Sequence, residues 1–284
     1  MKDFEDKVAV ITGAASGIGR GLADRCIQEG MKVVLADIET PALEQTEAEL
    51  RDKGGHVVAV QTDVSKENDI EHLANKTVDN FGAVHLLFNN AGVSVGASPL
   101  WELTQLDWKW IMGVNLLGVI HGLKVFIPIM LRQDSECHIV NTASIAGLSS
   151  MSNPAYAMTK HGVVGLTEAL HLQLRQIDAK IRVSVLCPGL IKTQIMESDR
   201  NRPAELQNES LTQTMTSQQQ AIREKFLQLR ETAMSPAQYA DRVFKAIREE
   251  KFYIFSEDKY LENVRQRMEI ILNDGTPELS KYFP

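Results

Sequence analysis

The chain has 284 residues and a formal net charge of −7, and its 44% apolar and 24% charged composition is typical of a globular protein. The acidic balance, with a pI near 5.6, argues against nucleic acid or an anionic membrane as the main partner and leaves small molecules as the expected ligands. Three widely spaced cysteines without a CxxC pair, and histidines without metal-ligand spacing, indicate neither a disulfide framework nor a metal site.

The start of the chain and its most apolar stretch favour a cytoplasmic protein. The opening MKDFEDK is polar and lacks the apolar segment of a secretory signal. Residues 114–131 form the most apolar run, but Asn115, His121 and Lys124 interrupt it, so we expect no membrane span there. The cysteine pattern fits a reducing compartment.

The first predicted element is a strand at 8–11, followed by the glycine-rich segment TGAASGIG and a helix that extends to residue 28. In such a strand–turn–helix unit, backbone N–H groups at the helix N-terminus can hold a phosphate. The glycines Gly13, Gly17 and Gly19 depart from the G-x-G-x-x-G spacing, although they can serve the same physical role.

An acidic residue follows the second predicted strand. The strand at 32–36 ends at Asp37, about 20 residues after the glycine segment, where an acid can bind a ribose 2′-hydroxyl. The alternative is that Asp37 caps the next helix.

Two further strands also end in polar or glycine-containing loops. The strand at 57–61 leads into a turn that contains Asp63 and Val64. The strand at 86–88 stops at Asn89-Asn90-Ala91-Gly92, a sequence that suits either a plain turn or a loop under a ligand.

A long helix is predicted from Thr104, which with Asp107 resembles a capping pair, to Met130. Asn115 lies inside this helix, where a polar amide among apolar neighbours either bonds locally or faces a ligand. A fifth strand at 137–142 comes next and is followed by Ser144.

The last third of the chain contains another helix and two more strands. Pro154 is well placed as the first residue of a helix that carries Tyr156 and Lys160. The sixth strand, 181–186, ends in Cys187-Pro188-Gly189, and a seventh is expected at 252–255.

Strands that alternate with helices over the whole length predict an α/β fold, a doubly wound parallel sheet of about seven strands with helices on both faces. We expect one domain over 1–284, with its core at about 7–255 and a charged helix and tail at 258–284. The polar segment 195–235 is either a helical lid over the site or a tolerated surface insertion, and its position after the sixth strand favours the lid. Many candidate ligand residues directly follow strands and therefore meet at one edge of the sheet, namely residues 13–19, Asp37, Asp63, residues 89–92, Ser144 and Pro188-Gly189.

Tyr156 and Lys160 are four residues apart on a predicted helix, so their side chains leave the same face. A cation within about 4–6 Å favours the phenolate, so Lys160 can make Tyr156 a base near neutral pH. Ser144 can donate a hydrogen bond to a substrate oxygen. A Tyr–Lys pair alone is common on helix surfaces, and its significance depends on the other motifs.

These motifs together resemble the short-chain dehydrogenase/reductase family over about 7–195. The matching residues are Thr12-Gly13-x-x-x-Gly17-x-Gly19, Asn89-Asn90-Ala91-Gly92, Asn115, Ser144, Tyr156-x-x-x-Lys160 and Pro188-Gly189. The resemblance implies a Rossmann-type sheet, a nicotinamide cofactor and an oxidoreductase.

It also implies roles for individual residues. Tyr156 would be the general acid and base, Lys160 would lower its pKa and bond the nicotinamide ribose, and Ser144 would position the substrate oxygen. Asn115 would hold a water that links Lys160 to solvent. The cofactor would contact Tyr156, Lys160 and a wider set: Gly13, Ser16, Gly17, Ile18, Gly19, Asp37, Asp63, Val64, Asn90, Ala91, Gly92, Pro188, Gly189, Ile191 and Thr193.

The expected cofactor is NAD(H) rather than NADP(H), because Asp37 would repel a 2′-phosphate and no cation stands at Ser16, Ile38 or Glu39. Arg20 is the nearest candidate cation but should point away from the ribose. The expected reaction interconverts a secondary alcohol and a ketone.

The pocket is expected at 93–100, 145–153 and 190–230, without an obvious cation cluster, which favours a neutral, fairly apolar substrate. Two alternatives stay open: an inactive cofactor-binding regulator on the same fold, and an epimerase or dehydratase. The helices at 104–130 and 154–174 carry apolar residues on more than one face, so we expect a homo-oligomer, a dimer or a tetramer.

Overall fold

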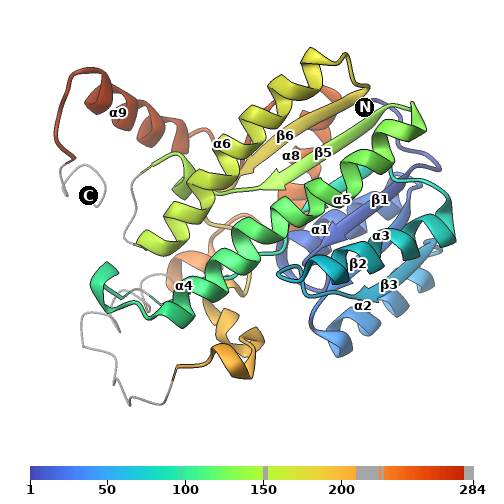
Figure 1. Cartoon of the computed structure of the whole chain (residues 1–284), viewed down its shortest axis with the longest axis horizontal. Helices are drawn as coiled ribbons and strands as arrows, with labels where there is room; N and C mark the ends of the chain where they lie inside the picture. The colour runs from blue at the N-terminus through green and yellow to red at the C-terminus, as the bar shows by residue number, and fades with distance from the viewer. Residues whose placement is uncertain (97, 150–152, 209–223, 225–226, 278–284) are drawn as a thin grey trace.

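The computed structural model describes residues 1–96, 98–149, 153–208, 224 and 227–277. Within them, seven parallel strands form one sheet in the order β3-β2-β1-β4-β5-β6-β7, which confirms the predicted doubly wound architecture (Figure 1). The strands are β1 (Val8–Thr12), β2 (Lys32–Asp37), β3 (Val57–Gln61), β4 (Leu86–Asn89), β5 (Cys137–Thr142), β6 (Ile181–Cys187) and β7 (Tyr253–Phe255).

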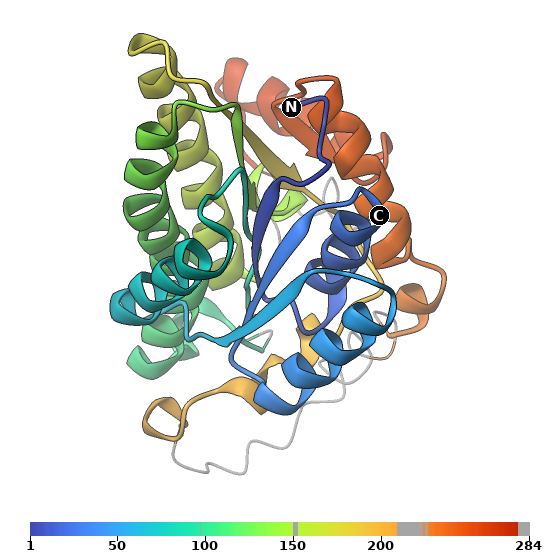
Figure 2. The same cartoon turned by 90° about the vertical axis from the view of Figure 1, so that its right-hand side faces the viewer.

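The helices cover both faces of the sheet, as Figure 2 shows. On one face α1, α2 and α8 pack over a core that includes Leu22, Leu43 and Phe244. On the other face α3, α5 and α6 enclose a second core around Leu73, Phe126 and Val163. These helices are α1 (Gly17–Gln28), α2 (Thr40–Asp52), α3 (Glu67–Phe81), α5 (Gly118–Gln133), α6 (Pro154–Gln176) and α8 (Pro236–Arg248).

Two-sided coverage explains the composition of the central strands. Every residue of β1 (VAVIT) and β5 (CHIVNT) is buried, so these strands read as nearly continuous apolar runs and show no alternation. The chain builds outward from β1 to β3 and then returns to place β4 beside β1. This reversal opens a crevice at the carboxyl ends of the strands, the usual ligand site of such sheets.

The long helix predicted from Thr104 to Met130 is interrupted. Thr104 does begin α4 (Gln105–Met112) with a capping box to Asp107, but a π-helical turn at Gly113–Leu117 separates α4 from α5. Asn115 lies in this turn, and its amide bonds the backbone of Val93 in a neighbouring loop. A π turn inserts one extra residue into a helix and often marks a functional site.

By length and apolar content the run from Gln105 to Gln133 could cross a membrane. Its apolar residues Val119, Leu123, Phe126 and Met130 nevertheless bury against the sheet. This is the packing of a core helix.

Short helical turns and a C-terminal helix complete the described chain. The turns are η1 (Leu100–Glu102), η3 (Ile145–Gly147), η4 (Ile195–Asn201) and η5 (Ala204–Leu206), and the helix is α9 (Tyr260–Leu272). Much of the segment 195–235, namely 209–223 and 225–226, lies outside the described residues, as does the end of the expected tail at 278–284. A helical lid over 195–235 therefore stays a prediction.

Candidate active site

A cleft of about 1310 Å³ lies at the carboxyl ends of the strands. It exceeds the roughly 300–1,000 Å³ of an ordinary small-molecule pocket, so it can hold a large ligand and a second, smaller one. All the site residues that the sequence predicts line this cleft except Gly19 and Asn115, which lie directly behind it. The lining members are Gly13, Ser16, Gly17, Ile18, Asp37, Asp63, Val64, Asn90, Ala91, Gly92, Ser144, Tyr156, Lys160, Pro188, Gly189, Ile191 and Thr193.

The glycine segment between β1 and α1 is packed too tightly for side chains. Gly13 has a φ of +66°, and a Cβ there would lie 2.9 Å from the Cα of Ala91. A Cβ at Gly19 would lie 2.0 Å from the carbonyl oxygen of Gly13. The segment therefore needs glycine for its close approach to the loop after β4 and for its left-handed backbone.

The loop after β4 forms the floor of the cleft. Thr12 accepts hydrogen bonds at Oγ1 from the backbone N–H groups of Asn90 (2.9 Å) and Ala91 (3.0 Å), and Asn90 Nδ2 donates to the Thr12 carbonyl (2.9 Å). Thr142, at the end of β5, donates from Oγ1 to Asn90 Oδ1 (3.3 Å). The ends of three adjacent strands, β1, β4 and β5, are thus hydrogen-bonded together beneath the cleft.

Asp37 ends β2 as a buried carboxylate beside the glycine segment. Its Oδ2 accepts from the backbone N–H of Ala15 (2.9 Å), and its Oδ1 accepts from that of Glu39 (3.0 Å). Burial raises the pKa of Asp37, and the backbone hydrogen bonds oppose that rise. Helix α2 begins at Thr40 without a side-chain cap, so the helix-cap alternative for Asp37 does not describe its contacts.

Arg20, the nearest predicted candidate for a cation, pairs instead with Asp24 (2.9 Å) and Glu49 (2.8 Å). It does not line the cleft. This is the orientation that the sequence argument expected.

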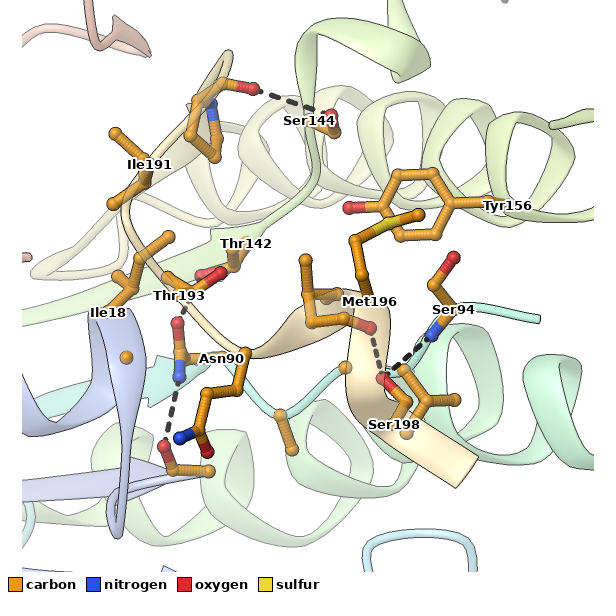
Figure 3. A pocket seen from close by; sticks show the side chains of 18 of the residues that line it. Ile18, Asn90, Ser94, Thr142, Ser144, Tyr156, Ile191, Thr193, Met196 and Ser198 are labelled. Atoms are coloured by element: carbon orange, nitrogen blue, oxygen red, sulfur yellow. Dashed lines mark hydrogen bonds between the residues drawn. The ribbon is translucent and has the colours of Figure 1, made fainter. Parts of the chain in front are cut away.

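Tyr156 and Lys160 project from the first turns of α6, where Asn153 caps the helix by accepting from the Tyr156 N–H (3.2 Å). In Figure 3 the Tyr156 hydroxyl points into the cavity, on the same side as Ser144 and Met196. The Lys160 Nζ donates to the Thr142 carbonyl (2.9 Å) and lies 5.5 Å from the centroid of the Tyr156 ring. The phenol and the ammonium are neighbours, as the spacing predicts.

Burial controls the protonation of both groups. It lowers the pKa of Lys160 to about 8 and raises the pKa of Tyr156, and a hydrogen bond with Ser144 opposes the rise. In the free protein the Tyr156 pKa thus shifts upward, whereas the sequence argument expected Lys160 to lower it. The reason is that removal from water disfavours the phenolate more than its surroundings stabilise it.

Ser144 follows β5 in an extended conformation at the edge of the cleft. Its Oγ accepts from the Ala146 N–H (3.1 Å) and donates to the Pro188 carbonyl (3.4 Å) after β6. The hydroxyl is therefore oriented by two strand-end loops and can turn toward a ligand oxygen.

Asn115 is fully buried, and its bonds tie it to the segments on either side of the cleft. Its Oδ1 accepts from the Val93 N–H (2.8 Å), and its Nδ2 donates to the Val93 carbonyl (2.9 Å) and to Thr159 Oγ1 (3.3 Å). A Cβ on Gly92 would lie 3.4 Å from Lys160 Nζ and 3.5 Å from Asn115 Oδ1, so both groups approach Gly92. These bonds fix the loop after β4, and the water-holding role remains a prediction.

The cleft also contains residues that sequence reasoning missed. Trp110 and Val114 line it from α4 and the π turn, and Tyr260 lines it from the start of α9. Tyr260 packs so closely on the loop after β6 that a Cβ on Gly189 would lie 2.0 Å from its ring, and its hydroxyl accepts from the Leu190 N–H (3.1 Å). Nothing in the local sequence around Tyr260 signals this contact.

The segment 195–208 crosses the cleft and is held on both sides. Arg202 pairs with Asp107 of α4 (2.7 Å), and its guanidinium lies 5.1 Å from the Trp110 ring centroid. Arg200 pairs with Glu39 (2.8 Å), just after β2. Ser198 Oγ also accepts from the Ser94 N–H (3.1 Å), so this segment closes over the pocket beside Tyr156 (Figure 3).

Comparison with known proteins identifies the family of the chain. Residues 7–204 match the model of the short chain dehydrogenase family. The chain belongs to this family. This membership and the seven-stranded sheet confirm the predicted family and fold.

Three relatives show how far the similarity extends. A crystal structure of a short chain dehydrogenase/reductase from Burkholderia phymatum in complex with NAD is 44% identical, with a TM-score of 0.93 over 98% of each chain. The CLA biosynthesis dehydrogenase/reductase of Lactiplantibacillus plantarum is 36% identical over 98% of both chains. The cyclohexanol dehydrogenase of an Acinetobacter strain is 38% identical over 68% of this chain and 76% of its own.

Proposed function

We propose that the protein is an NAD(H)-dependent oxidoreductase that interconverts a secondary alcohol and a ketone. The observation that carries the proposal is the convergence of Tyr156, Ser144 and Lys160 at one end of a cleft that continues to the glycine segment and Asp37. Membership of the short chain dehydrogenase family and the NAD complex of the Burkholderia relative support the class and the cofactor.

The residues fit the cofactor at both ends. The tightly packed glycines expose backbone N–H groups at the start of α1 for the pyrophosphate, and Asp37 offers carboxylate oxygens to the adenine ribose. Lys160 and Thr193 line the cleft and would contact the nicotinamide end of the cofactor. When bound, NAD⁺ supplies the acceptor for the substrate hydride.

Tyr156 would remove the proton from the substrate hydroxyl during oxidation and return it during reduction. Its pKa is raised by burial in the free protein, so phenolate formation depends on nearby positive charge, for which Lys160 stands 5.5 Å from the ring. Ser144 would hold the substrate oxygen beside Tyr156. Asn115 would fix the loop at Val93 and hold the water that connects Lys160 to solvent.

The substrate would be a small neutral molecule with apolar bulk. Val95, Trp110, Ile145 and Met196 line the Tyr156 end of the cleft, and Ser94, Asn153 and Ser198 add neutral polar groups. The similarity to the cyclohexanol dehydrogenase supports a cyclic or branched secondary alcohol in this place. We further propose a cytoplasmic location, for which the three buried free cysteines are suited.

The test is to incubate the purified protein with NAD⁺ and a panel of secondary alcohols that includes cyclohexanol, and to follow the absorbance of the reduced cofactor. Turnover of at least one alcohol is expected, and the Tyr156→Phe protein serves as the matched control. A protein that binds NADH but oxidises none of the alcohols and reduces none of the matching ketones would contradict the proposal. That result would favour an inactive cofactor-binding regulator or a different reaction.

A further inference from the structure

The end of the cleft beside Asp37, where the adenine ribose would lie, is called the ribose end. It contains a set of hydrogen-bond donors that point at two carboxylates of the protein itself. Asp37 accepts from the backbone N–H groups of Ala15 (2.9 Å) and Glu39 (3.0 Å). Glu39 in turn accepts at Oε1 from Arg200 Nη2 (2.8 Å) and Nε (3.1 Å), and from Asn201 Nδ2 (2.7 Å). Two backbone N–H groups, a guanidinium and an amide are therefore satisfied by internal anions.

Donors of these kinds commonly bind phosphate in proteins. Arginine binds phosphate oxygens with two parallel N–H donors, and backbone N–H groups supply further bonds. Asp37, Glu39, Arg200 and Asn201 all line the cleft, so the donors lie at its surface. The pair of Glu39 and Arg200 is only part-buried, with 27% and 33% of the side chains exposed, and water reaches it.

Arg200 is held in place by more than Glu39. Its Nη1 donates to the backbone carbonyls of Glu197 (2.9 Å) and Gln194 (3.3 Å), at the start of the segment that crosses the cleft. Two residues later, Arg202 is anchored in a buried ion pair with Asp107 on the opposite side of the cleft. Because these contacts do not involve Glu39, we expect the Arg200 guanidinium to stay at the ribose end when Glu39 is removed.

We propose that this end of the cleft is a latent phosphate site, and that Asp37 and Glu39 together keep it filled and so exclude the 2′-phosphate of NADP(H). Asp37 blocks the backbone donors, and Glu39 neutralises Arg200 and occupies Asn201. Glu39 is thus a second specificity-determining residue, and Arg200 is the cation that sequence reasoning did not find. The inference rests on the proposed function in that it places the adenine ribose beside Asp37.

Loss of Asp37 alone and loss of both Asp37 and Glu39 should affect cofactor binding differently. Loss of Asp37 alone weakens NADH binding and frees the backbone donors, but Arg200 stays paired with Glu39. Loss of both acids leaves Arg200, Asn201 and the Ala15 N–H for a phosphate. A charge-assisted contact of this kind corresponds to a gain of about tenfold to hundredfold in affinity.

The experiment measures NADH and NADPH affinities by fluorescence titration, without any alcohol substrate, for the wild type and three variants. The variants are Asp37→Ser, Asp37→Ser with Glu39→Ala, and this double variant with Arg200→Met added. Serine at position 37 removes the carboxylate and keeps a small polar side chain, so the Ala15 and Glu39 N–H groups lose their anionic acceptor. Calorimetric titration with adenosine 2′,5′-bisphosphate against 5′-AMP repeats the comparison on the ribose end alone.

The expected result is that the double variant binds NADPH at least about tenfold more tightly than Asp37→Ser does, and that Arg200→Met abolishes this gain. A double variant that binds NADPH no better than Asp37→Ser, or a gain that survives Arg200→Met, would overturn the inference while wild-type NADH binding upheld the proposed cofactor. A wild type that binds neither nucleotide would instead contradict the proposed function itself. If the double variant does not fold, Glu39→Ala alone must still raise the NADPH affinity, with Arg200→Met in that background as the control.

Discussion

Replacement of Lys160 by methionine should stabilise the cofactor-free protein at neutral pH. Lys160 has only 2% of its surface exposed, and burial lowers its pKa from 10.5 to about 8. This fall means that folding the charged lysine costs about 3 kcal/mol more than folding the neutral amine. Methionine fills a similar volume without charge and loses a hydrogen bond to Thr142 worth about 1 kcal/mol, so the net gain at pH 7 is about 2 kcal/mol.

The pH dependence of this effect follows from the direction of the pKa change. At pH 7 the lysine is charged in both states, and the wild type bears the whole cost. Between pH 8 and 10.5 the folded protein has released the proton while the unfolded chain still holds it, so the stability of the wild type rises with pH. The advantage of Lys160→Met should therefore shrink by about 2 kcal/mol between pH 7 and pH 9.5.

The assay is urea unfolding of the cofactor-free protein at the two pH values, with all proteins in a Tyr156→Phe background so that the phenol does not titrate. The exposed Lys76, which forms no ion pair with the part of the chain that the structure describes, gives the matched control. Lys76→Met should change the free energy of unfolding by no more than about 0.5 kcal/mol at either pH. A Lys160→Met protein that is less stable than its parent at pH 7, or whose advantage does not change with pH, would refute the reasoning.

Two other predictions follow from the packing around the cleft, and a third from the outer surface of α5 and α6. Gly189→Ala places a Cβ against the Tyr260 ring and should weaken NADH binding by about fivefold to hundredfold in a fluorescence titration, and adding Tyr260→Ala should recover part of the loss. Arg202→Met leaves the buried Asp107 carboxylate unpaired and should lower the free energy of unfolding by about 3 kcal/mol in urea titrations; if adding Asp107→Asn restored nothing, the ion pair would not be the cause. The exposed apolar residues on the outer sides of α5 and α6 should bury against a second copy, so light scattering should give a multiple of 31.7 kDa, and a monomer mass at micromolar concentration would reject the oligomer.

The sheet and the cluster of candidate site residues could be predicted from the sequence because each depends on the local order of residues along the chain. Apolar β-branched runs end in glycine, amide or acidic residues, and a parallel sheet brings all these ends to one edge. Tyr156 and Lys160 needed only the helical period to be placed on one face. The cleft gathers these residues as predicted.

Contacts between distant segments could not be predicted in this way. Tyr260 reaches Gly189 across 71 residues, and Arg200 reaches Glu39 across 161, without a pattern in either segment that names its partner. The π turn at Asn115 was missed because a single inserted residue hardly alters the apolar period of a long helix. The raised pKa of Tyr156 was missed because burial is a property of the folded chain.

The central claim is that Tyr156 transfers the proton while the rest of the site binds the cofactor. The most direct measurement is kcat/KM of Tyr156→Phe for the best alcohol, alongside its NADH affinity. The ring and its packing remain in this variant, so NADH affinity should stay within about threefold of the wild type, while kcat/KM falls by about 10²–10⁴. Retention of activity within about tenfold of the wild type, with NADH still bound, would contradict the account.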